Sequence, residues 1–166
     1  MEKNQNKQNE EPECCPKFEP ALWDEKILDW YTKKFVKGSI CTFMYMPLNF
    51  GSVMRKLDAK IRESDTSMQK DGMGLSDHTS PWNMDIYLAV DKEVNGLANV
   101  TLTGKFLCKV FEGNFRETGK WTIDYETFAK SKSLKIEKMY MWYTTCPKCA
   151  KKYGKNYVAI LGKIIL

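Results

Sequence analysis

The sequence predicts an α+β domain with an antiparallel or mixed sheet and its helices on one side. Two observations predict this class: strand patterns outnumber helix patterns, and both recur in the same order along the chain. We therefore predict a duplicated strand–helix–strand–strand (βαββ) unit in which each half covers the other's sheet.

The composition favours one globular domain with a substantial core. The chain has 166 residues, of which 43% are hydrophobic and 28% charged. Aromatic residues make up 13%, and there are nine methionines, an excess that suits a core that also walls a pocket.

The charge and hydropathy of the sequence argue against membrane and nucleic-acid partners. Residues 1–12 contain no apolar run, and no window approaches the roughly 20 apolar residues of a membrane span. We expect a cytoplasmic protein without a membrane partner, its six cysteines reduced. The net charge is +5, and the densest basic run (Lys148, Lys151, Lys152, Lys155) has no nucleic-acid motif beside it, so we expect a solvated edge and no nucleic-acid partner.

The N-terminal region divides into two parts. Residues 1–12 are polar and predict a disordered tail. Residues 13–37 predict an extension that packs across a main domain at 38–166. It combines a Cys-Cys-Pro segment with a short helix starting at Pro20, whose shared face is Trp23, Ile27, Trp30 and Tyr31.

The first predicted unit runs from residue 40 to residue 90. A strand at 40–46 is followed by a helix at 49–63, with Phe50, Val53, Met54, Leu57 and Ile61 on one stripe. Residues 64–81 predict a long polar loop that exposes His78, with a catalytic base as the second interpretation of that histidine. Met84 to Val90 alternate as a strand.

The second predicted unit repeats this plan. A strand at 100–112 bends at Gly104, and the helix at 117–132 places Trp121, Tyr125 and Phe128 on one face at i, i+4 and i+7. Strands at 136–144 and 156–165 complete the unit.

These features resemble a GyrI-like domain, the small-molecule-binding fold also found as the effector-binding part of MerR-type multidrug regulators. The resemblance covers about residues 38–165 and rests on the βαββ order, the last two strands and one turn. In that turn, Lys109-Val-Phe-Glu-Gly-Asn-Phe115 is similar to the family's His-x-Gly-Pro-Tyr, with Phe111 in place of His.

The resemblance implies a ligand cavity between the two halves, lined by aromatic side chains and often holding one glutamate. In the regulators that glutamate meets cationic drugs, and in some stand-alone members it serves hydrolysis of electrophilic cyclopropanoid compounds. This sequence departs from the family just before its last strand, because residues 153–158 supply no acidic residue.

A carboxylate in an aromatic pocket could act as general acid or base, or hold a cation against aromatic faces. The catalytic candidates are Glu112, which shares the strand parity of Phe106, and Asp85, which shares a face with Tyr87; Glu137 is a third carboxylate. An exposed strand-end carboxylate is the alternative for each. The ligand-binding candidates, about half of them expected to be plain core, are Tyr45, Trp82, Tyr87, Trp121, Tyr140, Trp142 and Tyr143.

Cys146-Pro-Lys-Cys149 is the sharpest local motif. Structural thiols are the first interpretation. The second is a metal site, with zinc as the metal, in which Cys146 and Cys149 join Cys14 and Cys15 to clamp the N-terminal arm. The third is redox chemistry, although 17 residues after Cys149 are too few for a thioredoxin-like fold.

We hypothesise that the protein binds an apolar or cationic small molecule in an aromatic pocket between two pseudo-symmetric repeats, without a required cofactor. The alternatives are a hydrolase acting on an electrophilic small molecule, with a pocket carboxylate directing water, and a cysteine-based metal or redox module.

Overall fold

The computed structural model describes residues 15–166, and it shows a closed antiparallel barrel. The predicted tail at 1–12 and Cys14 lie outside the described residues. The strands are β1 (Ile27–Phe43), β2 (Met46–Pro47), β3 (Gly74–Ser80), β4 (Asn83–Ala89), β5 (Ala98–Glu112), β6 (Ile136–Tyr143) and β7 (Tyr157–Ile164). The helices are α1 (Phe50–Glu63), α2 (Thr118–Ser131) and α3 (Pro147–Tyr153), with 3-10 turns η1 (Pro20–Leu22) and η2 (Phe115–Glu117).

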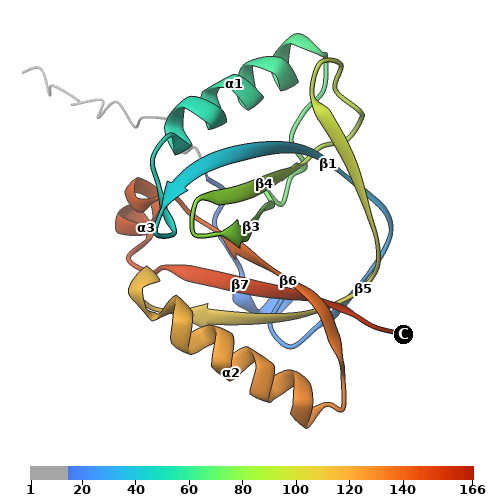
Figure 1. The fold of residues 1–166 in the computed structure, drawn as a ribbon, viewed down its shortest axis with the longest axis vertical. Coiled ribbons are helices and arrows are strands. Elements are labelled where there is room, and N and C mark those ends of the chain that lie inside the picture. Colours follow the sequence, from blue (N-terminus) through green and yellow to red (C-terminus); the bar gives the residue numbers. More distant parts are fainter. Residues whose placement is uncertain (1–14) are drawn as a thin grey trace, which may run out of the picture.

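The strand order is β2-β1-β4-β3-β6-β7-β5, and β5 also pairs with β1. That last pairing closes six strands into a barrel, because β1 and β5 are long enough to serve both halves (Figure 1). The predicted α+β class with an antiparallel sheet is confirmed, although the sequence did not indicate closure.

Both long helices pack on the outer surface of the barrel, over different strands (Figure 1). Leu57 and Ile61 of α1 are buried against β1 and β4, and Trp121 and Tyr125 of α2 against β5 and β7. These are the helix faces that the 3.6-residue periodicity predicted, except that Phe50 at the start of α1 is 42% exposed.

The element order is β1-α1-β3-β4 and then β5-α2-β6-β7, with β2 and α3 added. This is the predicted order. That the two halves are similar in space stays a prediction.

The predicted N-terminal helix is wrong. Residues 20–22 form a single 3-10 turn, and the chain enters β1 at Ile27. A register shift between Trp30 and Lys33 interrupts the strand alternation, so the aromatic residues fall at helix-like intervals.

The predicted loop at 64–81 is also wrong in its second half, because residues 74–80 form β3. His78 is therefore a half-buried strand residue rather than an exposed loop residue. The predicted strand at 40–46 instead contains a turn at Met44 and Tyr45, both with positive φ, which joins β1 to β2.

Candidate binding site at the polar end of the barrel

The interior of the barrel is packed with large side chains. Its central members include Phe35, Leu75, Phe106 and Leu161, all with no exposed surface. The aromatic hollow expected between the two halves is thus filled along its middle, and the two ends of the barrel are where chemistry can occur.

One end is closed by the chain itself. The segment before β1 places Phe18 and Trp23 against Trp142 of β6, with ring centroids 5.2 and 4.8 Å from that ring. The Asp24 carboxylate accepts a hydrogen bond of 2.9 Å from the backbone N–H of Val110, which fixes the segment to β5.

Four charged side chains occupy the opposite end, which we call the polar end. Each lies two residues along its strand from a buried interior residue, so strand alternation directs it inward. They are Lys37 after Phe35, Asp77 after Leu75, Asp85 before Tyr87, and Lys138 before Tyr140.

Asp85 is the most heavily partnered of the four. Its side chain is 10% exposed and accepts from Lys37 at 3.0 Å, the Ser39 hydroxyl at 2.9 Å and the Asn83 amide at 3.1 Å. Burial alone would raise the pKa of Asp85, but the hydrogen bonds from Lys37, Asn83 and Ser39 outweigh it and leave the pKa below its usual value. The carboxyl is therefore ionised at neutral pH.

Asp77 forms a second ion pair beside the first. Asp77 and Asp85 are cross-strand partners on β3 and β4, and Lys138 of β6 reaches Asp77 at 2.7 Å. The hydrogen bond from Lys138 to Asp77 raises the pKa of that lysine, as the bond to Asp85 does for Lys37. Two carboxylates thus lie next to each other, each neutralised by its own lysine.

Two tyrosine rings form the floor beneath these pairs. Tyr87 and Tyr140 meet edge to face with centroids 5.7 Å apart. The Lys37 ammonium lies 5.8 Å from the Tyr87 centroid, and the Lys138 ammonium 5.3 Å from the Tyr140 centroid. The lysines thus occupy the positions over aromatic faces that a cationic ligand would seek.

The structure brings together three of the predicted site residues, Asp85, Tyr87 and Tyr140. The others are dispersed. Trp142 faces the closed end, and Trp121 and Tyr143 belong to the outer layer under α2. Tyr45 and Trp82 are more than half exposed near the turn between β1 and β2.

The expectation that Glu112 points inward is wrong. Its side chain is 54% exposed, and the Lys155 ammonium lies 3.9 Å from its carboxylate. Glu112 is the last residue of β5 and pairs with Tyr157 at the closed end, so its strand parity does not bury it. Glu137 is also exposed and pairs with Lys163 at 3.2 Å.

Sequence reasoning missed Asp77, Lys37 and Lys138. Asp77 was hidden because β3 resembles a loop. The lysines were not considered because lysine is usually a surface residue. The available signal was parity, since both lysines are two positions from a core aromatic residue.

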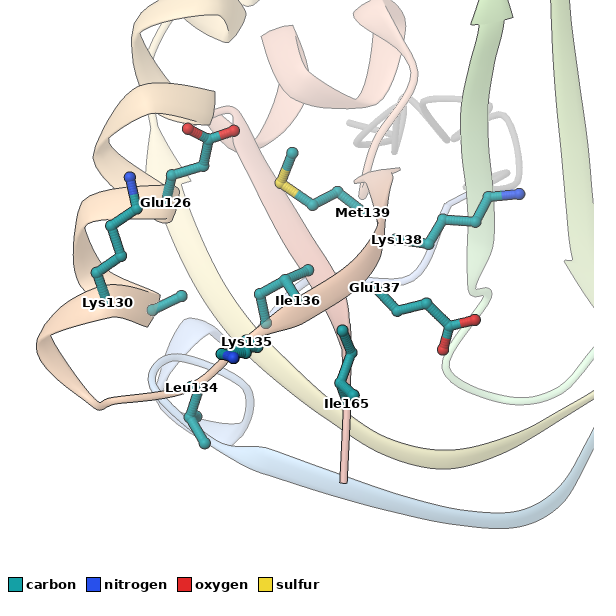
Figure 2. Close-up of a pocket in the computed structure, with 10 residues that line it drawn as sticks. Glu126, Lys130, Leu134, Lys135, Ile136, Glu137, Lys138, Met139 and Ile165 are labelled. Atoms are coloured by element: carbon teal, nitrogen blue, oxygen red, sulfur yellow. The ribbon is translucent and has the colours of Figure 1, made fainter.

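A hollow of about 580 Å³ lies outside the barrel, between α2 and β6. Figure 2 shows Ile136 and Met139 lying between the helix and the strands, with Glu126 and Lys130 on the helix side. Lys138 points away from α2, toward the green strands (Figure 2). Lys138 also lines this hollow, so the hollow and the polar end share that residue, although its ammonium is directed toward Asp77 at the polar end.

Three of the four cysteines in the predicted metal site lie together. Cys146 and Cys149 at the start of α3 meet Cys15, and the three sulfurs lie within 4.8 Å of one another. All are thiols, the ligand type that prefers soft metals such as zinc.

This barrel with two outer helices has the GyrI-like fold that the sequence predicted. The chain belongs to the family described as bacterial hydrolase, whose profile matches residues 5–164. No curated protein matches it. No helix within residues 15–166 has the length and apolar character needed to cross a membrane.

Two solved structures illustrate the shared fold. The C-terminal domain of EcmrR is 7% identical, with a TM-score of 0.64 over 87% of this chain and 98% of that one. A hydrolase from Listeria innocua is 12% identical, with a TM-score of 0.59 over 84% of this chain and 91% of that one.

Proposed function

We propose that the protein binds a small aromatic cation at the polar end of the barrel. The observation that carries this proposal is the pair of neighbouring carboxylates, Asp77 and Asp85, set beside the rings of Tyr87 and Tyr140. In this proposal Lys37 and Lys138 hold the cation positions until a ligand displaces them.

Displacing the lysines costs little. Their side chains are 34% and 44% exposed, and ion pairs of that exposure contribute only about 0 to 1 kcal/mol. The side chains of Asp85 and Asp77 are only 10% and 12% exposed. A cationic ligand that binds there leaves water and gains contact with a carboxylate and a tyrosine ring. A cation over a tyrosine ring contributes about 0.5 to 2 kcal/mol.

A fluorescence titration with ethidium, an aromatic cation, tests the proposal. Asp85→Asn should weaken ethidium binding about tenfold, a loss of about 1.4 kcal/mol. Lys37→Met should strengthen it, because the competing ammonium is gone. Glu112→Gln is the matched control, since it removes the same charge at the other end of the barrel, and it should leave the affinity unchanged.

Equal ethidium affinity in the wild type, Asp85→Asn and Lys37→Met would contradict the proposal. The anionic dye anilinonaphthalene sulfonate adds a check on charge. Removing Lys37 should not strengthen its binding.

The family description favours a second candidate, hydrolysis of an electrophilic small molecule with Asp85 directing water. Asp85 is buried and ionised, but its lowered pKa makes it a weak base near neutrality. The two functions separate in Asp85→Asn: a hydrolase loses turnover and keeps substrate affinity, whereas a binder loses affinity.

A further inference from the structure

Three cysteines from two distant parts of the chain converge where the N-terminal segment crosses α3. Cys149 is buried, and Cys15 and Cys146 are half-buried. The backbone N–H of Cys146 donates to the Cys15 sulfur at 3.3 Å, and the Tyr153 hydroxyl donates to the Cys15 carbonyl at 2.8 Å. These contacts hold Cys15 against α3 through both its backbone and its sulfur.

We infer that Cys15, Cys146 and Cys149 bind a zinc ion that fastens the N-terminal segment over the closed end of the barrel. Zinc–sulfur bonds of about 2.3 Å in a tetrahedron separate the sulfurs by about 3.8 Å. All three sulfurs lie within 4.8 Å of one another, so ligation requires shifts of about an ångström. A disulfide, at about 2.05 Å, would join two of them and leave the third outside the bond.

The local backbone suits ligation. Cys146 is the N-cap of α3 with an extended backbone, and Pro147 opens the helix. Cys149 follows three residues later, so both sulfurs lie on one side of the first turn. The pair is thus a preformed half of the site, and Cys15 supplies the ligand that closes it across the fold.

Charge also favours the metal. Ligation deprotonates the thiols, so three thiolates with one Zn²⁺ carry a net charge of −1. Lys148, Lys151 and Lys152 all lie within three residues of Cys149 in the sequence, so the site lies in a basic stretch of the chain. The densest basic run of the chain, which sequence analysis assigned to a solvated edge, therefore gains a local reason.

The site links metal binding to closure of the barrel. Cys15 is three residues before Phe18, which packs on Trp142 and, with centroids 5.7 Å apart, on Tyr157. Metal loss would therefore leave the chain before Phe18 held by the hydrogen bonds to Cys15 and by packing. Zinc usually takes four ligands in such sites, so a donor other than these three cysteines would supply the fourth.

Metal analysis of the full-length chain, expressed without a histidine tag, tests this inference. We expect one zinc per chain in the wild type, and loss of that zinc in Cys15→Ser, Cys146→Ser and Cys149→Ser. Cys41→Ser is the matched control, because Cys41 is an exposed cysteine on β1, far in sequence from the cluster. It should keep the zinc.

A second measurement needs no variant. Cobalt(II) added to the reduced, chelator-treated wild type should give a thiolate-to-metal charge-transfer band. Chelation should also speed proteolytic cleavage within residues 15–26.

Three results would overturn the inference. One is a wild type that neither carries zinc nor gives the cobalt band. Another is full zinc content in Cys146→Ser and Cys149→Ser. The third is a disulfide between two of the three cysteines in protein isolated without reductant.

Discussion

Trp23 and Trp142 meet edge to face, with ring centroids 4.8 Å apart and planes at 89°. Trp142 is almost fully buried at the closed end of the barrel, and Trp23 comes from the segment that precedes β1. The N-terminal segment is therefore part of the core rather than an appendage to it.

Trp23→Ala should lower the free energy of unfolding by about 2 to 3 kcal/mol, because it removes a large ring from a packed aromatic cluster. Urea unfolding followed by circular dichroism measures this loss. Leu22→Ala is the control, since Leu22 is 68% exposed, and its effect should stay within about 0.5 kcal/mol. Equal effects would mean that the segment does not pack on Trp142.

Gly162→Ala should destabilise the fold by about 2 to 3 kcal/mol through overpacking. A Cβ at this position would overlap the Tyr125 hydroxyl and come within 2.8 Å of Ile136 Cγ2. Gly119 provides the contrast, because a Cβ there meets nothing within 4 Å. Gly119→Ala should stabilise α2 by up to about 0.5 kcal/mol, and thermal unfolding of the two variants should show opposite signs.

Tyr125→Phe should cost about 1 to 2 kcal/mol. The buried Tyr125 hydroxyl donates to the Leu107 carbonyl at 2.9 Å, and its removal leaves that carbonyl without this donor. Burial also raises the pKa of Tyr125. Urea unfolding at neutral pH measures the loss, and an unchanged midpoint would show that the hydrogen bond contributes nothing.

Stability should fall as the pH drops below about 6.5. Burial lowers the pKa of His78 in the folded state, and Nδ1 has no hydrogen-bond partner within the described part of the chain. The unfolded state then binds the proton more readily, so acid favours unfolding in this window. The pKa of Asp85 is also lowered in the folded state, so this carboxyl adds a further loss of stability once the pH falls below 3.8, its usual pKa.

His78 is the only histidine, so one variant isolates its effect. His78→Gln should reduce the change in melting temperature between pH 7 and pH 5. A slope that persists in the variant would assign the pH dependence to other groups.

The sequence predicted the elements that have a clean period. Leu57 and Ile61 in α1 and Trp121 and Tyr125 in α2 repeat at helical spacing, since each helix buries one stripe. The start of β1 was missed because a bulge after Trp30 breaks its alternation, and β3 was missed because most of its residues are polar.

The site was predicted in part for the same reason. Asp85, Tyr87 and Tyr140 follow from strand parity, but it is the pairing of β3 with β6 that places Lys138 on Asp77. That pairing joins residues 61 positions apart, and no local pattern encodes it. The cysteine cluster joins Cys15 to Cys146 across a still longer separation.

A crystal structure of the protein with bound ethidium tests the central claim most directly. We predict the ligand's rings over Tyr87 and Tyr140, its charge beside Asp85, and the Lys37 ammonium displaced from its present position 3.0 Å from that carboxylate. Ethidium in the hollow between α2 and β6, with both lysine–aspartate pairs intact, would contradict the account.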